Sequence, residues 1–235
     1  MNTHKIVLIT GTRKGLGREM SLHYLNQGHH VIGCSRGNST IDSPQYEHYL
    51  LDVGDEKSVI AMVKAIHRKH GRIDVLINNA GIAAMNHITL SPGSTAKNIF
   101  DTNFFGTFIF TREVSKIMLL KKYGRIINLV TVATPLRLEG EALYAASKAA
   151  VLNFTQIAAK ELGHYGITVN AIGPTPTPTD LIRTVPKEKI EALVSQQAIK
   201  RTANYDDTIN VIDFFINDRS NFITGQVIYL GGISN

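Results

Sequence analysis

The chain contains 235 residues, of which 43% are hydrophobic, and it has a formal net charge of +6. Its apolar runs are too short to cross a bilayer, its first residues lack the pattern of a secretory signal, and its basic residues are dispersed, which argues against membrane insertion, secretion and nucleic-acid binding. A chain of this length can bury one large core, so we expect a single cytoplasmic domain over residues 1–235.

Short apolar runs alternate with helical patterns along the chain. The segments that read as strands are 5–10, 30–34, 73–80, 124–131, 167–172 and 226–230. The segments that read as helices are 18–27, 56–70, about 95–121, about 143–162, about 187–197 and about 205–217. This alternation predicts the α/β class, with a Rossmann-like, doubly wound parallel sheet flanked by helices on both faces. The proline-rich segment 173–180 is expected to be a loop at the carboxyl edge of this sheet, where ligands bind.

A glycine-rich turn, TGTRKGLG over residues 10–17, follows the first strand. Gly11 allows a sharp turn, Gly15 allows the backbone to approach a ligand, and Gly17 allows the helix to pack closely on the strand. The start of the following helix offers unpaired N–H groups to a pyrophosphate, and Leu16 belongs to the same expected site. The turn therefore predicts a dinucleotide site.

The end of the second strand bears on the choice between NADP(H) and NAD(H). An NAD site usually has an acidic residue about 20 residues after the turn, whereas this chain has Ser35 and Arg36. Arg36, together with Arg13 and Lys14 in the turn, supplies cations suited to a 2′-phosphate. Each cation alone could be a solvated loop charge, but three at one predicted place favour NADP(H) over NAD(H).

Tyr144 and Lys148 are four residues apart in an alanine-rich helical pattern, so they lie on one face of the helix. A nearby cation lowers the pKa of a phenol from its usual value of about 10, which would make Tyr144 a general acid or base. A tyrosine and a lysine on a solvated helix surface give the same spacing, so the pair alone does not decide its role.

In combination, the motifs along the whole chain resemble the short-chain dehydrogenase/reductase family. The residues that carry the resemblance, in family order, are Thr10–Gly17, Asp52, Val53, Asn78, Asn79, Ala80, Gly81, Asn103, Tyr144, Lys148 and Pro174. The resemblance implies that Tyr144 protonates a carbonyl oxygen as hydride arrives from nicotinamide. It also implies that Lys148 lowers the pKa of Tyr144 and binds the nicotinamide ribose, and that Asn103 holds a water next to Lys148.

The resemblance also implies the remaining contacts of the site. These contacts are Asp52 and Val53 at the adenine, Asn79, Ala80 and Gly81 at the ribose and sheet edge, and Pro174, Thr177 and Thr179 near the nicotinamide. Two residues depart from the family pattern. Thr131 stands where a serine usually binds the substrate oxygen, and Thr175 stands where a glycine usually follows the proline. A threonine hydroxyl offers the same donor and acceptor, so we expect Thr131 to bind the substrate.

By this resemblance the protein is an NADP(H)-dependent oxidoreductase acting on a carbonyl or secondary alcohol. Its nearest resemblance is to the 3-oxoacyl-carrier-protein reductases, so the substrate is a small molecule or an acyl thioester. The family also implies a homodimer or homotetramer packed through the helices near 95–121 and 143–162. An alternative, motivated by Thr131 and Thr175, is a dinucleotide-binding sensor or scaffold with little or no catalysis.

The histidines and the single cysteine do not predict a metal site. The close histidine pairs are His29 with His30 and His67 with His70, and neither comes with a cysteine or carboxylate at metal-ligand spacing. We therefore expect both pairs to lie on the solvated surface. Cys34, the one cysteine, cannot form an internal disulfide.

Overall fold

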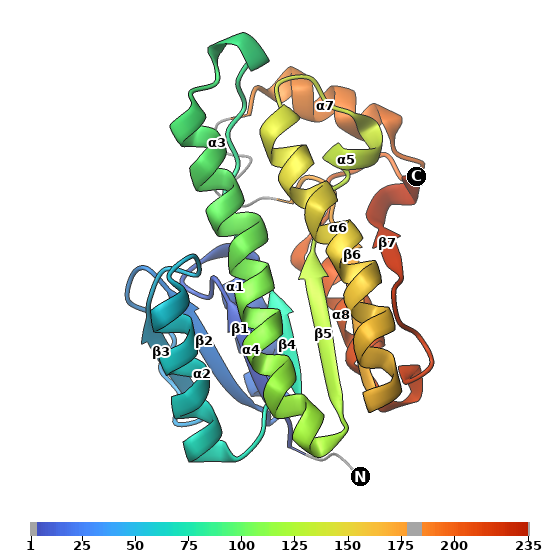
Figure 1. The fold of residues 1–235 in the computed structure, drawn as a ribbon. Helices are drawn as coiled ribbons and strands as arrows, with labels where there is room; N and C mark the ends of the chain where they lie inside the picture. The colour runs from blue at the N-terminus through green and yellow to red at the C-terminus, as the bar shows by residue number, and fades with distance from the viewer. Residues whose placement is uncertain (1–3, 178–184, 235) are drawn as a thin grey trace.

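Seven parallel strands form the centre of the structure (Figure 1). The computed structural model describes residues 4–177 and 185–234. The strands lie in the order β3-β2-β1-β4-β5-β6-β7. Their bounds are β1 Ile6–Thr10, β2 His30–Ser35, β3 Tyr46–Leu50, β4 Val75–Asn78, β5 Gly124–Leu129, β6 Ile167–Gly173 and β7 Val227–Tyr229. The strand order reverses between β1 and β4, which confirms the predicted doubly wound sheet and places a ligand crevice at the carboxyl ends of these strands.

Helices cover both faces of the sheet (Figure 1). The α-helices are α1 Gly15–Asn26, α2 Glu56–His70, α3 Gly93–Phe100, α4 Gly106–Lys121, α5 Ala133–Leu136, α6 Ala142–Leu162, α7 Lys187–Gln196 and α8 Tyr205–Ile216. The π-helical turn η2 spans Asp101–Phe105, and the short 3-10 turns are η1 Ile88–Leu90, η3 Gly163–Tyr165, η4 Asp218–Ser220 and η5 Leu230–Gly232. Among the described residues, no helix is long and apolar enough to span a membrane.

The central strand β1 shows how the sequence builds two cores. Successive side chains of a strand point to opposite faces of the sheet. Ile6 and Leu8 pack in the core under α2, α4 and α6, whereas Val7 and Ile9 pack in the core under α1 and α8. Each such burial contributes about 1.5–3 kcal/mol. A continuous apolar run is therefore the sequence signature of a strand covered on both faces.

The elements that differ from the expectations drawn from sequence pattern include a divided helix and an edge strand, and the short helix α5 was not predicted. The helix expected over about 95–121 is divided into α3, the turn η2 and α4, because backbone pairing changes to the π-helical pattern at Asp101–Phe105. The edge strand β3 was not among the segments that read as strands. Its sequence, YEHYL, has no continuous apolar run. Its residues are partly buried or exposed, since β2 is its one neighbour in the described sheet.

Candidate active site

A cavity of about 890 Å³ opens at the carboxyl ends of the central strands. Its walls come from the segments that follow β1, β2, β3, β4, β5 and β6, from the first turns of α6 and from α7. The sequence-predicted residues on these walls are Gly11, Arg13, Lys14, Gly15, Leu16, Gly17, Ser35, Arg36, Asp52, Val53, Asn79, Ala80, Gly81, Thr131, Tyr144, Lys148, Pro174 and Thr177. Asn103 is fully buried and is not among the lining residues, and Thr179 lies outside the described residues.

The glycine turn between β1 and α1 has no room for a side chain at Gly11 or Gly17. Gly11 and Gly15 have positive φ angles of 76° and 59°, which glycine adopts without strain. A Cβ atom at Gly17 would lie 2.2 Å from the carbonyl oxygen of Gly11 and 2.6 Å from Nδ2 of Asn79. No side-chain hydrogen bond caps the N-terminus of α1 in the described chain. This open helix end and the bare backbone fit the pyrophosphate of a dinucleotide.

Hydrogen bonds between β1 and β4 hold the turn in place. Nδ2 of Asn79 donates to the carbonyl oxygen of Thr10 at 2.8 Å. The hydroxyl oxygen of Thr10 accepts from the backbone N–H groups of Asn79 and Ala80 at 3.0 and 2.9 Å. The Asn79 side chain therefore fixes the position of the turn, in addition to lying on the cavity wall.

Cationic side chains gather at the end of the cavity near β2. Nη1 of Arg36 lies 3.9 Å from Oδ2 of Asp52, and the two side chains are 68% and 47% exposed. The side chain of Arg13 lies beside Gly37, where an added Cβ would be 3.1 Å from Nη1. Ser35 donates its hydroxyl to the carbonyl of Gly37 at 2.7 Å. An exposed ion pair of this length contributes at most about 1 kcal/mol, so Arg36 can turn toward a phosphate at little cost.

Tyr144 and Thr131 both line the other end of the cavity. Burial raises the pKa of Tyr144 to about 12; the Thr131 hydroxyl acts against this rise and the charge of Glu141 adds to it. Burial also lowers the pKa of Lys148 to about 8, and its Nζ donates to the carbonyl of Leu129 at 2.6 Å. Burial dominates the pKa of Tyr144 in this structure, and the predicted lowering of that pKa by Lys148 stays a prediction.

Asn103 lies in the π-helical turn η2, and its side chain connects this turn to the backbone of Ile82 and to Ser147 of α6. Its Oδ1 accepts from the N–H of Ile82 at 2.8 Å, and its Nδ2 donates to the carbonyl of Ile82 at 2.9 Å and to the hydroxyl of Ser147 at 3.0 Å. A Cβ at Gly81 would lie 3.3 Å from Oδ1 of Asn103 and 3.4 Å from Nζ of Lys148. π-Helical turns of this kind occur often at functional sites.

Comparison with known proteins agrees with this geometry. A family model described as short chain dehydrogenase matches residues 5–190. The chain belongs to the short-chain dehydrogenase family. The 3-oxoacyl-(acyl-carrier-protein) reductase FabG of Buchnera aphidicola is 31% identical over 97% of this chain and 96% of its own length. BbsD of Thauera aromatica, a subunit of a hydroxy(phenyl)methylsuccinyl-CoA dehydrogenase, is 33% identical over 97% of this chain and 96% of its own length.

The solved structures give the same result for the fold. A structure of ElxO with NADP bound is 30% identical to this chain, with a TM-score of 0.89 and coverage of 98% of both chains. The family and its members' reductase and dehydrogenase names confirm the predicted oxidoreductase class and the resemblance to 3-oxoacyl-carrier-protein reductases. They also support a nicotinamide dinucleotide as the cofactor.

The two departures from the family pattern have clear positions in this short-chain dehydrogenase. The hydroxyl oxygen of Thr131 accepts from the N–H of Ala133 at 3.1 Å, which orients it beside Tyr144. Ser147 is fully buried and donates to the carbonyl of Tyr144 at 2.7 Å, so it does not reach the cavity. Thr175 is not among the described residues with positive φ, so it occupies the glycine position without left-handed strain.

Glu141 is a residue of the cavity that the sequence reasoning missed. It lies three positions before Tyr144, lines the cavity and is only 9% exposed. Its Oε2 atom is buried without a hydrogen-bond partner in the described structure, and burial raises its pKa, with Lys189 acting in the opposite direction. The sequence offered no signal beyond an acidic residue at the start of a helix.

Proposed function

We propose that this short-chain dehydrogenase transfers hydride between NADP(H) and a carbonyl or secondary alcohol, with Tyr144 donating or accepting the proton. The observation that carries the proposal is that the hydroxyl groups of Tyr144 and Thr131 lie on the wall of one cavity, where the Thr131 hydroxyl acts to lower the pKa of Tyr144. Lys148 lies one helical turn from Tyr144 and lines the same cavity. The glycine turn and this pair line one cavity, which supports hydride transfer between a dinucleotide at the turn and a substrate at Tyr144.

The chain's own residues supply proton transfer and charge stabilisation. When bound, the cofactor supplies or accepts the hydride. Tyr144 and Thr131 present two hydroxyl groups to one carbonyl oxygen, which stabilises the negative charge as it develops. A phenol with a pKa of about 12 is a stronger acid than water, whose pKa is about 15.7. Tyr144 therefore gives its proton to an alkoxide readily. Lys148, one turn from Tyr144 on helix α6, is the cation of that helix nearest to this proton transfer.

The preference for NADP(H) rests on the charges near β2. Arg13, Lys14 and Arg36 line the cavity there. Asp52 is the acidic residue on this wall, and it lies 3.9 Å from Arg36. Arg36 could leave Asp52 and bind a 2′-phosphate, because an exposed ion pair contributes little free energy. Guanidinium groups bind phosphate through paired hydrogen bonds, which favours NADP(H) over NAD(H).

We propose an acyl thioester with a 3-oxo group as the substrate. The relatives with reductase and dehydrogenase names act on acyl-carrier-protein and CoA derivatives by those names. The cavity extends from Tyr144 to helix α7, where Ile190 and Leu193 offer an apolar wall and Lys189 a cation. An apolar channel ending in a cation suits an acyl chain joined to an anionic carrier. Glu141, buried and unpaired beside Tyr144, offers a hydrogen-bonding group to the substrate.

The test is NADPH oxidation by the purified protein with short 3-oxoacyl thioesters and simple ketones. We expect turnover by the wild type and a loss of about 10²–10⁴-fold in Tyr144→Phe, which is the usual contribution of a general acid. NADPH affinity should change little in this variant. If the wild type and Tyr144→Phe both bind NADPH and neither reduces any of these carbonyls, the protein would instead be a dinucleotide-binding sensor or scaffold.

We also propose a homodimer or homotetramer packed through α4 and α6. Both helices expose large apolar side chains, with Leu120 of α4 71% exposed and Ile157 of α6 51% exposed. Phe105, at the end of η2 just before α4, is 47% exposed. Light scattering on the eluting protein measures the mass directly, and Ile157→Glu should shift it toward the monomer.

A further inference from the structure

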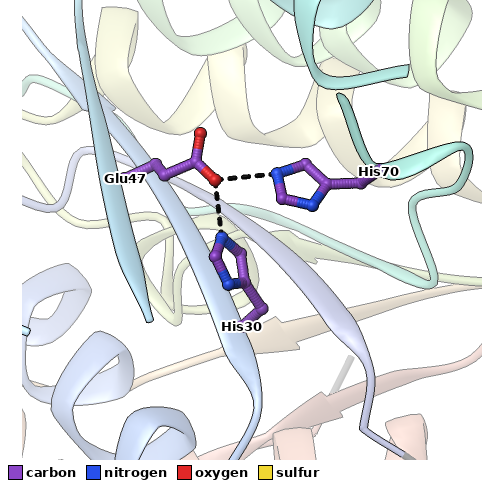
Figure 2. Close-up of side chains that lie close together, drawn as sticks. All are labelled: His30, Glu47 and His70. Carbon is purple, nitrogen blue, oxygen red and sulfur yellow. Dashed lines mark hydrogen bonds and ion pairs between the residues drawn. The ribbon is translucent and has the colours of Figure 1, made fainter. Parts of the chain in front are cut away.

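Three side chains with metal-binding atoms lie close together (Figure 2). They lie near the amino-terminal ends of β2 and β3, whereas the cavity opens at the carboxyl ends of the strands. They are His30 at the start of β2, Glu47 in β3 and His70 at the end of α2. Nε2 of each histidine lies 2.7 Å from the same oxygen, Oε1 of Glu47. The expectation that these histidines lie on solvated surface without a carboxylate is wrong, and His29 too is buried, at 5% exposure.

Strand register explains why the three side chains meet. Ile32 pairs with Glu47 across β2 and β3, so their side chains point to the same face of the sheet. His30, two residues before Ile32, points to that face as well. Ile32 packs in the core under α2, and His70 is the last residue of that helix. The fold therefore delivers three ligands from three elements to one place.

The two carboxylate oxygens of Glu47 face different partners in this cluster. Lys69 contacts the other carboxylate oxygen, Oε2, at 3.0 Å, and its side chain is 60% exposed. Oε1 therefore faces the two imidazoles alone. The C-terminal end of α2 adds partial negative charge at this place.

We propose that His30, Glu47 and His70 bind Zn²⁺ through two imidazole nitrogens and one carboxylate oxygen, with water as the fourth ligand. The three ligand atoms lie within 4.8 Å of one another. Tetrahedral bonds of about 2.0–2.1 Å place ligand atoms roughly 3.3 Å apart, so each Nε2 must move about 0.6 Å away from Oε1. The side chains are 24%, 17% and 13% exposed, which leaves a path for the ion and its water.

The ion would tie the edge strand to the rest of the sheet. Among the described strands, β3 pairs with β2 alone, and it is partly exposed along its length. A site that joins β3, β2 and α2 exists only in the folded chain, so Zn²⁺ stabilises that chain by mass action. Because the cluster lies at the amino ends of the strands and the cavity at their carboxyl ends, the ion acts on stability and not on hydride transfer.

The test uses the full, untagged chain after treatment with a chelator. Zinc chloride is titrated in competition with a chromophoric chelator, and Co²⁺ absorption reports the coordination geometry. We expect one Zn²⁺ per chain and a higher melting temperature with Zn²⁺. Because loss of an outer-shell partner alone costs about 10–100-fold in metal affinity, His30→Ala or His70→Ala should weaken binding by about 100-fold or more. His164→Ala, at an exposed histidine outside the cluster, is the matched control.

Circular dichroism establishes that each variant is folded. If a histidine variant fails to fold, Glu47→Gln, which keeps the shape of the side chain, carries the test alone and should weaken Zn²⁺ binding by at least tenfold. The absence of saturable binding by the wild type would overturn the proposal. Equal Zn²⁺ affinity in the wild type and in the folded cluster variants would overturn it as well, and would place the bound zinc elsewhere.

Discussion

Replacement of Gly17 by alanine should damage both stability and cofactor binding. The backbone of Gly17 is not among those with positive φ, so alanine meets no conformational strain there. The new Cβ would lie 2.2 Å from the Gly11 carbonyl oxygen, whereas ordinary contacts begin near 3.4 Å. Helix α1 and the turn must therefore move apart by roughly 1 Å. Overpacking of this kind costs about 1–3 kcal/mol, or about 2–12 °C in melting temperature for a chain of this size.

The cofactor assay separates this effect from general destabilisation. Fluorescence titration of folded Gly17→Ala with NADPH should show at least a tenfold loss of affinity, which corresponds to about 1.4 kcal/mol. The matched control is Gly163→Ala at the end of α6, where φ is −59° and no atom lies within 4 Å of the added Cβ. That variant should gain about 0.4–1 kcal/mol. A Gly17→Ala protein with wild-type stability and wild-type NADPH affinity would refute the close packing and the role of the turn.

Substitutions at three further residues test the charges and hydroxyls of the cavity. Arg36→Ala should weaken NADPH binding at least tenfold and leave NADH binding unchanged in fluorescence titrations; equal losses for both cofactors would contradict a 2′-phosphate site. Thr131→Val should reduce kcat by about 10²–10³-fold, the usual effect of losing one oxyanion donor, while Thr131→Ser retains most of it in the same NADPH oxidation assay. Lys148→Met should be stabilised relative to the wild type at pH 7, since burial of the ammonium lowers its pKa from 10.5 to about 8. Between these two pKa values the unfolded chain holds more protons than the folded chain, so the stability of the wild type rises with pH. Urea unfolding should therefore show that the stability advantage of the variant shrinks from pH 8 to 10.5. An advantage that grows with pH would be inconsistent with a buried lysine.

Features that depend on neighbouring residues could be predicted from the sequence. The glycine turn is defined by spacing within residues 10–17, and the positive φ angles of Gly11 and Gly15 follow from it. Tyr144 and Lys148 share a face because a helix repeats at this spacing. The continuous apolar run of β1 indicated a strand covered on both faces. Local geometry carries these features, so the fold class and the cavity wall could be anticipated.

Features that depend on distant pairing could not be predicted in the same way. His30, Glu47 and His70 meet only because β3 pairs with β2 in one register, and β3 has no apolar run to indicate it. The raised pKa of Tyr144 depends on how deeply the cavity buries it, which no spacing reveals. The hydrogen bond from Lys148 to the Leu129 carbonyl likewise joins α6 to the end of β5.

Hydride transfer itself is the most direct test of the proposed function. NADPH carrying deuterium on the reactive face of the nicotinamide is incubated with the protein and a 3-oxoacyl thioester, and the hydroxyacyl product is analysed by mass spectrometry. We expect one deuterium in the product with the wild type and almost none with Tyr144→Phe in the same time. The experiment is run with NADPH deuterated on either face of the nicotinamide. If the protein binds NADPH but the substrate is recovered unreduced and unlabelled in both cases, the result would contradict the assignment of this chain as a carbonyl reductase for such substrates.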